Sequence, residues 1–322
     1  MRKLLGSLLL GTIAGVTWCQ AAVANNYPEH PIKLIVPYPP GSGTDTVARY
    51  TAKRLEEKLS QTIVVENRPG GNAIIAAQAV IQSKPDGYTL LWAANGPVTT
   101  NVALHKKLPY DPLTDLAPVA RLALSPMGLY VPAKSPYKSA TELLNAAKKA
   151  PMSLNAGSGS ATYNIATEWL LSLADARATI VNYGGSAPTI TALAGSQTDF
   201  TIVEYSAALS LVKAGKIRLL AMTIDNRFHA EPDTPTLQEL GYKDFFQVAW
   251  WGIFAPANTP NDVVSRLEKT SLEICEDQQT KTWLEQHNYS QFCGSAQELH
   301  RFQKSEIERE TRLVKQFKIP QI

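Results

Sequence analysis

The chain has 322 residues, of which 31 are Lys or Arg and 28 are Asp or Glu, so its formal net charge is +3. This near balance lacks the strongly basic character of a nucleic-acid-binding protein, and we expect no nucleic-acid partner. Apolar residues make up 44% of the chain, as in an ordinary globular protein, and the length is sufficient for two domains.

The first 24 residues have the pattern of a secretory signal. A basic start precedes an apolar run at Leu4–Val16, and Ala22–Ala24 fits the small-x-small rule for cleavage. The run is shorter than the ~20 residues of a membrane-spanning helix, which disfavours the alternative of an uncleaved anchor. Cys19 would permit a lipoprotein, but Trp18 stands where a small residue is expected. We therefore expect export, cleavage near Ala24 and a soluble periplasmic protein of net charge 29 − 28 = +1, since the signal carries two basic residues and no acidic one.

Short apolar runs alternate with helical segments along the rest of the chain, which is typical of α/β units with a parallel sheet. In chain order we predict a strand at Ile32–Val36, a helix at Asp45–Leu59, a strand at Thr62–Glu66, a helix at Asn72–Ser83, a strand at Thr89–Ala93, an extended run at Pro118–Val131, a helix at Ala140–Lys149, a strand at Ser153–Ala156, a helix at Thr162–Leu173, a strand at Ala178–Tyr183, a helix at Pro188–Ala194, a strand at Asp199–Val203, a helix at Ala207–Lys213, a strand at Ile217–Thr223, an extended run at Gln247–Ala257, and helices at Asn261–Glu276, Gln278–Gln286 and Ala296–Phe317.

The two long extended runs divide the chain into three parts. The middle part has its own set of strands and helices, whereas the first and last parts would need each other to complete a core. The sequence therefore predicts two α/β lobes joined by two crossing strands, with a cleft between them. We place lobe 1 at residues 25–123 plus 248–322 and lobe 2 at residues 124–247.

The segment Ile32–Asp45 is the most informative local pattern. An apolar run ends at prolines, a small-residue loop at Pro39–Asp45 follows, and a helix begins. The first N–H groups of a helix have no intrahelical partner and carry partial positive charge from the helix dipole, and glycine lets another group approach them closely. The loop is therefore a candidate seat for a small anion.

Two further loops have the same pattern. Asn155–Thr162 and Tyr183–Pro188 each follow a predicted strand and precede a predicted helix, with Pro188 expected at the first helical position. In a doubly wound lobe such loops lie at the carboxyl edge of the sheet, where ligands bind. For any one loop, the alternative is a capped turn in which Gly and Ser serve backbone geometry alone. Three such loops in an exported protein favour a site that holds a carboxylate.

Side chains near these loops suggest further roles. Glu204 ends a predicted strand, where it could accept a ligand ammonium, hydroxyl or ring N–H, the alternative being a solvated strand end. Asp45 is expected to cap or charge the first helical turn. Alternation places one of Trp250 and Trp251 toward a core and the other on the opposite side, where it could floor the cleft. The stretch Ala94–Asn101 is predicted to be a polar loop with Asn and Thr groups that could contact a ligand.

The sequence contains no assembled catalytic or metal-binding pattern. Gly41–Thr46 has two glycines of a dinucleotide fingerprint but neither the third glycine nor the lysine of a phosphate loop, and no Ser has Gly at both −2 and +2. The 5 histidines are scattered without zinc spacing. We expect no cofactor, no metal and no catalysis, although an enzyme whose residues gather in space, such as a hydrolase or isomerase, is the competing hypothesis.

Two cysteines follow the predicted signal, Cys275 on a predicted helix and Cys293 on a short strand-like run. In an oxidising periplasm such a pair can form a disulfide. The alternative is two buried small apolar residues, and the sequence leaves both possibilities open.

Five stretches carry a resemblance to a known family. They are Tyr27–Asp45, Glu66–Asn72, Pro85–Leu91, Gly215–Ala221 and Trp251–Pro260, and they occur in matching order across essentially the whole mature chain. With these motifs the chain resembles the Bordetella uptake gene (Bug) family, the periplasmic solute receptors of tripartite tricarboxylate transporters.

The resemblance implies a type II periplasmic binding protein, whose cleft closes over a small carboxylate or amino-acid-like ligand held by main-chain N–H groups, hydroxyls and water. Its ligand loops map to Pro39–Asp45, Ala94–Asn101, Ser158–Tyr163 and Tyr183–Gly185, and its acidic ligand contact maps to Glu204. The resulting predicted ligand-binding residues are Tyr38, Pro39, Gly41, Ser42, Gly43, Thr44, Asp45, Asn95, Thr99, Ser158, Gly159, Ser160, Thr162, Tyr163, Tyr183, Gly184, Gly185 and Glu204.

Departures from the family pattern lie at or near the cleft. Tyr163 and Asn164 stand where many members carry histidines, Ser42 replaces a common glycine, and Phe200–Glu204 replaces a bulkier Met-Phe-Asp ending. These changes concern the identity of the ligand, not the fold.

Taken together, we expect a monomeric periplasmic receptor that captures a small carboxylated solute and presents it to a membrane transporter, without chemistry on the ligand. A receptor that feeds a two-component sensor is the second hypothesis, and an enzyme acting on a small acid is the third. Which acid is bound does not follow from the sequence.

Overall fold

The computed structural model describes residues 27–322, so the predicted signal at 1–24 and its cleavage site lie outside the described residues. The strands are β1 (Ile32–Val36), β2 (Ile63–Asn67), β3 (Thr89–Ala94), β4 (Leu116–Pro132), β5 (Asn155–Ser158), β6 (Thr179–Asn182), β7 (Phe200–Glu204), β8 (Ile217–Met222), β9 (Val248–Pro256) and β10 (Ser290–Gly294). The helices are α1 (Gly43–Leu59), η1 (Gly71–Ala73), α2 (Ile74–Ile81), η2 (Gly96–Thr100), α3 (Asn101–Leu104), α4 (Ala140–Lys149), α5 (Ala161–Leu173), α6 (Ser186–Ala194), α7 (Tyr205–Lys213), α8 (Asn261–Glu276), α9 (Gln278–Gln286) and α10 (Ala296–Gln316).

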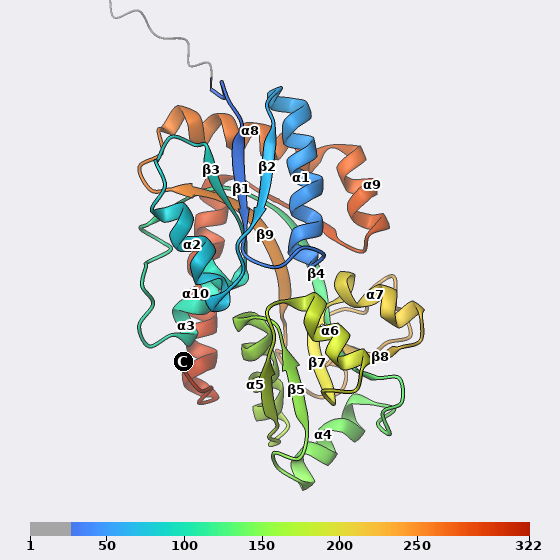
Figure 1. Ribbon diagram of the computed structural model, residues 1–322. Coiled ribbons are helices and arrows are strands. Elements are labelled where there is room, and N and C mark those ends of the chain that lie inside the picture. The colour runs from blue at the N-terminus through green and yellow to red at the C-terminus, as the bar shows by residue number, and fades with distance from the viewer. Residues whose placement is uncertain (1–26) are drawn as a thin grey trace, which may run out of the picture.

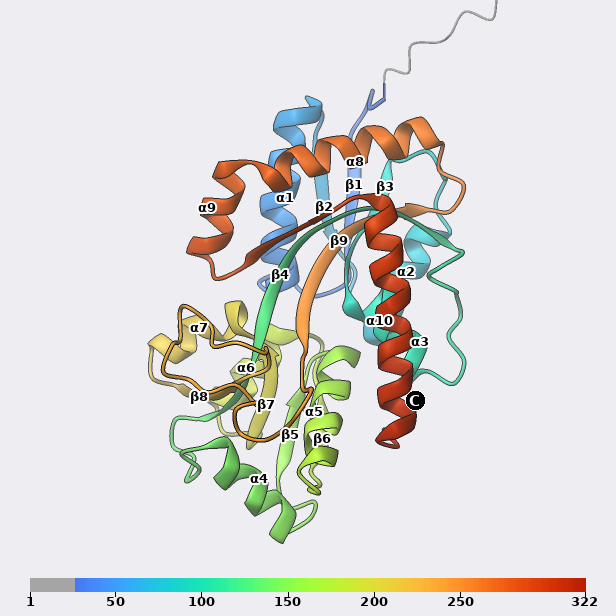
Figure 2. The ribbon, with the colours of Figure 1, turned by 180° about the vertical axis from the view of Figure 1, so that it is seen from behind.

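Two α/β lobes make up the molecule, as the sequence predicts (Figure 1). The strand order β2-β1-β3-β9-β4-β7-β5-β6 links their sheets through β9 and β4, and both β8 and β10 also pair with β4. In Figure 2 helix α10 runs from the upper lobe down to the level of α5 in the lower lobe. Within residues 27–322, no helix has both the length and the apolar character of a membrane span.

The first lobe is built around β1, which pairs in parallel with β2 and β3. Strand β9 adds to β3 in the antiparallel direction, and all of its residues are buried. Ile32 and Leu34 of β1 share a buried apolar cluster with Leu55 of α1 and Leu267 of α8. The apolar faces of α1 and α8 are therefore what close this core.

The second lobe contains β5, which pairs in parallel with β6 and β7, while β7 and β8 run antiparallel to β4. Its buried cluster joins Phe200 of β7 to Ile165 of α5 and Leu193 of α6. Leu313 and Val314 near the end of α10 belong to the same cluster. Helix α10 thus packs on both lobes.

The long strand β4 crosses between the lobes. Its first part, Leu116–Pro126, pairs with β9, and its last part, Met127–Pro132, pairs with β7 and β8. The chain returns to the first lobe through Gln247, whose N–H donates to the carbonyl of Thr223 at 3.0 Å, and then enters β9. The prediction of two crossing strands is confirmed.

Cys275 at the end of α8 and Cys293 in β10 form a disulfide, with Cα atoms 5.8 Å apart and 18 residues of sequence separation. The disulfide links β10, which pairs with β4, to α8, which packs on the core of the first lobe. Of the two possibilities that the sequence leaves open, the structure has the bonded one.

The predicted polar loop at Ala94–Asn101 is wrong. Residues Gly96–Thr100 form a π-helical turn, η2, which continues directly into α3. Pro97 lies in the first positions of this turn, where its missing N–H costs no intrahelical bond. All residues of η2 are buried, because α5 and α10 pack against it. Tertiary packing therefore makes a polar, Gly-Pro-containing stretch helical.

Several element boundaries at the loops of interest also differ from prediction. Helix α1 begins at Gly43, two residues earlier than predicted, and α5 begins at Ala161, one residue earlier. Strand β5 covers Asn155–Ser158, two residues later than predicted. Helix α6 begins at Ser186, so Pro188 is its third residue and not its first. Pro is tolerated there because the N–H groups of the whole first turn lack intrahelical partners.

Candidate functional site

A small cavity lies between the lobes and is lined from both sides. Its volume is about 20 Å³, room for about one water molecule. The lining residues are Tyr38, Ser42, Thr44, Ala94, Asn95, Ser160, Thr162, Tyr163, Ser186, Glu204, Ala249 and Trp251. The structure therefore brings together eight of the predicted ligand-binding residues, namely Tyr38, Ser42, Thr44, Asn95, Ser160, Thr162, Tyr163 and Glu204.

The first wall is the N-terminus of α1. Ser42 caps this helix, with its side chain accepting from the Asp45 N–H at 3.2 Å, and it is almost fully buried. Thr44 accepts the indole N–H of Trp251 at 2.9 Å, which fixes the ring against the cavity. The N–H of Gly43 points across the lobe boundary, 3.5 Å from Oγ of Ser186.

Gly43 has a steric role at this boundary. A Cβ placed on it would lie 2.6 Å from Oε1 of Glu204 in the second lobe, closer than real Cβ atoms come to any neighbour. Glycine at position 43 is therefore what lets the Glu204 carboxyl reach the N-terminus of α1. The predicted anion seat receives a carboxyl of the chain itself in this arrangement.

Asp45 does not line the cavity. Its carboxylate accepts from the Gly41 N–H at 3.0 Å, from Arg49 at 3.0 Å and from Asn67 at 2.8 Å. Although burial favours its neutral form, these hydrogen bonds and the Arg49 charge hold the pKa of Asp45 below its usual value. The predicted structural role of Asp45 fits these contacts.

The second wall is the N-terminus of α5. Ser160 caps it by accepting from the Tyr163 N–H at 3.3 Å. Ser158, which is buried, donates instead to the Ser160 carbonyl at 3.1 Å. Gly159 packs so closely on the Gly185 carbonyl that a side chain would clash. Ser158 and Gly159 thus shape the loop without lining the cavity.

The third loop leads into α6. Gly185, with φ 149°, precedes Ser186, which lines the cavity. Tyr183 donates its N–H to the Ser158 carbonyl at 2.7 Å, and Gly184 has open space where a side chain would begin. Of the predicted residues in this turn, Tyr183, Gly184 and Gly185 do not line the cavity.

Three other predicted residues also lie outside the lining set. Pro39 packs near Gly185 across the lobe boundary, and Gly41 takes the positive φ of 80° that the turn before α1 requires. Thr99 is fully buried in η2 and donates to the Asn95 carbonyl at 2.9 Å. The Thr99 hydroxyl is thus used by the backbone, as the Gly41 N–H is by the Asp45 carboxylate.

Glu204 stands at the meeting point of the loops. It is 2% exposed and accepts a hydrogen bond from the Tyr163 hydroxyl. Burial raises the pKa of Glu204, while hydrogen bonds from Tyr163, Ser186 and the Gly43 N–H oppose the rise. Burial and the Glu204 charge together raise the pKa of Tyr163 well above its ordinary value, so Tyr163 stays a donor.

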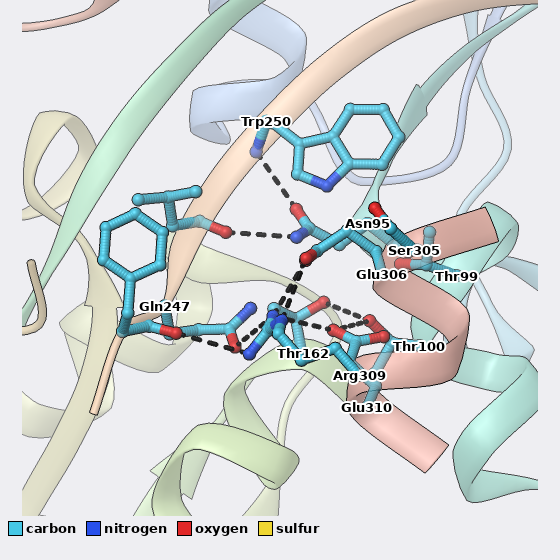
Figure 3. Close-up of polar contacts among 12 residues, drawn as sticks. Asn95, Thr99, Thr100, Thr162, Gln247, Trp250, Ser305, Glu306, Arg309 and Glu310 are labelled. Carbon is cyan, nitrogen blue, oxygen red and sulfur yellow. Dashed lines mark hydrogen bonds and ion pairs between the residues drawn. The ribbon is translucent and has the colours of Figure 1, made fainter. Parts of the chain in front are cut away.

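Asn95 joins the cavity to the returning strand β9 (Figure 3). Its Nδ2 donates to the Val248 carbonyl at 3.0 Å, and its Oδ1 accepts from the Trp250 N–H at 3.0 Å. Both amide atoms are therefore occupied by backbone. Trp251 lines the cavity, whereas Trp250 packs on Phe302 in the core, which is the alternation that the sequence predicts.

The predicted set misses four lining residues, Ala94, Ser186, Ala249 and Trp251. Ser186 directly follows the turn Tyr183–Gly185, and its position after two glycines is the signal in the sequence that could have identified it. For Trp251, the alternation of side chains along a strand predicts only that either Trp250 or Trp251 faces the cleft. Ala94 and Ala249 carry no chemical signal, since they contribute only small apolar surface.

The lining is suited to hydrogen bonding. Hydroxyl groups and helix N-termini face one carboxyl, Glu204, and no histidine or cysteine lines the cavity. Among residues 27–322, no group of three or more His, Cys, Asp or Glu side chains could hold a metal ion. Such a lining can accept a small polar molecule through donors at the helix starts and one strong acceptor.

Comparison with known proteins places this geometry in context. Residues 47–319 match the model of the tripartite tricarboxylate transporter family receptor. The protein BugT of Bordetella pertussis is 33% identical over 251 residues, covering 76% of each chain. The structure of R. palustris Rpa4515 with adipate superposes with a TM-score of 0.89 at 31% identity, covering 92% of this chain and 100% of that one.

A further solved structure is MatC (Rpa3494) from Rhodopseudomonas palustris with bound malate. Its TM-score is 0.85 at 28% identity, and the match covers 89% of this chain and 100% of that one. The likeness extends over both lobes and the crossing strands.

Proposed function

This chain belongs to the tripartite tricarboxylate transporter receptor family, and we propose that it captures a small carboxylated ligand between its lobes and delivers it to a membrane transporter. The observation that carries the proposal is the cavity on which the N-termini of α1, α5 and α6 converge from two lobes. Such ends favour negative charge without any cation nearby. The relatives solved with adipate and with malate support a carboxylated ligand.

The proposed polarity of the site follows from Glu204. A ligand carboxylate is held at the start of α5, by Ser160 and Thr162, while Glu204 accepts a ligand hydroxyl or ammonium. Tyr38, Ser42 and Thr44 complete the first-lobe side. The remaining predicted residues of the three loops act by shaping the backbone around this cavity.

Ligand capture works by population shift. With the lobes apart, the Gly43 N–H loses its contact with Ser186 and the Glu204 carboxyl leaves the start of α1. A ligand that bridges both walls stabilises the closed arrangement. The lobes are proposed to divide at residues 123/124 and 247/248, where β4 and the segment before β9 pass between them.

Three further properties complete the proposal. The precursor is exported and cleaved near Ala24, the mature receptor is a monomer, and it leaves its ligand chemically unchanged. Intact mass of the secreted protein tests the first, because a mass that includes residues 1–24 or a lipid on Cys19 contradicts cleavage. Recovery of unmodified ligand after denaturation tests the last.

Native mass spectrometry of freshly purified protein, followed by a thermal-shift panel, tests the function. The panel contains succinate, malate, adipate and aspartate, with succinamide as a neutral control. We expect at least one acid to raise the melting temperature, since a ligand that binds only the folded state stabilises it. If no acid raises the melting temperature and no small-acid mass is retained, the proposal is wrong.

A matched pair of variants locates the site. Ser160→Ala and Ser139→Ala each remove a helix cap in the second lobe, since Ser160 caps α5 and Ser139 caps α4. Both should cost about 1 kcal/mol of stability. Only Ser160 lines the cavity, so only Ser160→Ala should also weaken acid binding; equal affinities in both variants would remove this loop from the site.

A further inference from the structure

A buried chain of hydrogen bonds connects the cavity to the C-terminal helix (Figure 3). Thr162, in the first turn of α5, lines the cavity. Its Oγ1 lies 3.1 Å from Oγ1 of Thr100 in η2, and that hydroxyl lies 3.1 Å from Oε1 of Glu310 in α10. Thr100 and Glu310 are 0% exposed and Thr162 is 4% exposed. This series of hydrogen bonds passes between the two lobes through buried side chains.

Glu310 is a carboxyl with incomplete partners. Arg309 Nη2 lies 3.9 Å from its Oε1 but is paired with Glu306 at 2.8 Å. Oε2 of Glu310 has no hydrogen-bond partner among the described residues. Burial raises the pKa of Glu310 to about 7, and Glu306 acts in the same direction, while Arg309, Thr100 and Thr99 oppose the rise.

The elements packed around α10 carry few titratable groups. Helix α5 carries Tyr163, whose hydroxyl donates to Glu204, and Glu168, on which the charge of Arg177 acts. Helix α3 and strand β10 carry no titratable side chain apart from Cys293, which is in the disulfide. The cation of β4, Arg121, lies over the rings of Phe292 and Phe302 at 3.6 and 4.7 Å from their centroids. Within residues 27–322, the charged groups that act on Glu310 are therefore those of its own helix, Arg309 and Glu306.

The direction of the hydrogen bonds follows from counting protons, because each hydroxyl has one proton to donate. With Glu310 ionised, Thr100 donates to Glu310 and Thr162 donates to Thr100, so Thr162 has only lone pairs left for the cavity. With Glu310 protonated on Oε1, the oxygen that faces Thr100, the bonds run the other way. Thr100 then receives from Glu310 and donates to Thr162, which frees the Thr162 proton for an acceptor in the cavity.

We propose that Glu310 is a positioning residue that determines, through Thr100, whether Thr162 offers a donor or an acceptor to the ligand. This inference rests on the proposed function. A ligand carboxylate needs a donor at Thr162, so its binding favours the state in which Glu310 is protonated. The proton comes from the solvent and resides on Glu310, and the receptor takes it up together with the acid.

Isothermal titration calorimetry in buffers of different ionisation enthalpy measures this uptake. The probe is whichever of succinate, malate and adipate binds the wild type most tightly. For the wild type we expect proton uptake approaching one per ligand at about pH 8, and an affinity about tenfold weaker at about pH 8 than at about pH 6. Glu310→Gln keeps a neutral donor beside Thr100, and should show no uptake and a flat affinity over the same range.

Companion variants separate positioning from a structural effect. Thr100→Val breaks the chain while leaving Glu310, and should abolish the pH dependence, whereas Thr100→Ser should restore it. Glu308→Gln makes the same chemical change at an exposed position of α10 and should behave as wild type. If Glu310→Gln does not fold, the two Thr100 variants carry the test.

The outcomes distinguish this inference from the proposed function. Binding with equal proton uptake in the wild type, Glu310→Gln and Thr100→Val would overturn the role of Glu310 and leave carboxylate capture standing. Failure of all three acids to bind the wild type would overturn the proposed function, and the inference with it.

Discussion

Replacing Gly43 with Ala should block closure of the lobes while leaving each lobe folded. The added Cβ would lie 2.6 Å from Oε1 of Glu204, which is 3.0 − 2.6 = 0.4 Å inside the closest approach that real Cβ atoms show. Overpacking of this kind costs about 1–3 kcal/mol. The cost falls only on the closed arrangement, because Gly43 and Glu204 belong to different lobes.

The expected loss of affinity follows from that cost. If closure accompanies binding, about 1–3 kcal/mol corresponds to roughly 5-fold to 150-fold weaker binding of the best acid in the panel. The stability of the first lobe should not fall, since Gly43 is not among the positive-φ glycines and Ala is the better helix former. In Gly43→Ala, the affinity measured by calorimetry should therefore fall, while the melting temperature of the ligand-free protein should not.

Two controls sharpen the experiment. Gly195→Ala adds the same methyl group where its neighbours lie at ordinary contact distances of 3.5 Å or more, and should leave affinity unchanged. A double-mutant cycle with Glu204→Ala should show positive coupling, since removing the carboxyl removes the clash. Wild-type affinity in Gly43→Ala, or simple additivity with Glu204→Ala, would refute the steric reasoning.

Three other predictions concern stability. Thr44→Val should lower the free energy of unfolding by about 1–3 kcal/mol, because the buried Trp251 indole N–H loses its acceptor; denaturant unfolding measures this, and a Thr44→Ser variant that is equally unstable would contradict it. Reduction of Cys275–Cys293 should cost ~3 kcal/mol for a loop of this length, and thiol labelling before and after reduction checks that the bond is present. For Glu310, whose pKa is raised to about 7, the folded state holds its proton more tightly than the unfolded chain, so stability is greatest below the unfolded pKa and is lost as pH rises through about 7; Glu310→Gln should flatten the stability curve in that window, and an unchanged curve would contradict the assignment.

Much of the fold was predictable because its signals are local. The apolar run of β1 and the amphipathic helices α4, α8 and α9 have the bounds that the sequence predicts. Each is delimited by chemistry within a few residues, such as the Ser139 cap of α4. Helix η2 was not predictable for the opposite reason, since its residues become helical through burial against α5 and α10, which are distant in sequence.

The loops of the candidate site were predictable, but the direction of individual side chains was not. A strand–glycine–helix pattern locates a helix N-terminus, so Ser42, Thr44 and Ser160 were found. The same pattern cannot tell that Asp45 turns away to Arg49 and Asn67. Glu310 had no signal at all, because one acidic residue in a long polar helix looks like a solvated surface position.

The position of Glu204 limits which acids the proposed site would favour. Its carboxyl lies at the start of α1, so a ligand carboxylate placed there would bring two like charges together, at a cost of about 4 kcal/mol at 4 Å in a partly screened site. A ligand hydroxyl or ammonium on that side gives Glu204 a hydrogen-bond donor that offsets this repulsion, and malate carries a hydroxyl beside one carboxylate that succinate lacks. Malate should therefore bind more tightly than succinate, by roughly tenfold for one hydrogen bond to a charged group. Glu204→Gln should reduce that preference, since the neutral amide accepts the hydroxyl less strongly; equal malate and succinate affinities in the wild type would show that Glu204 does not select the ligand.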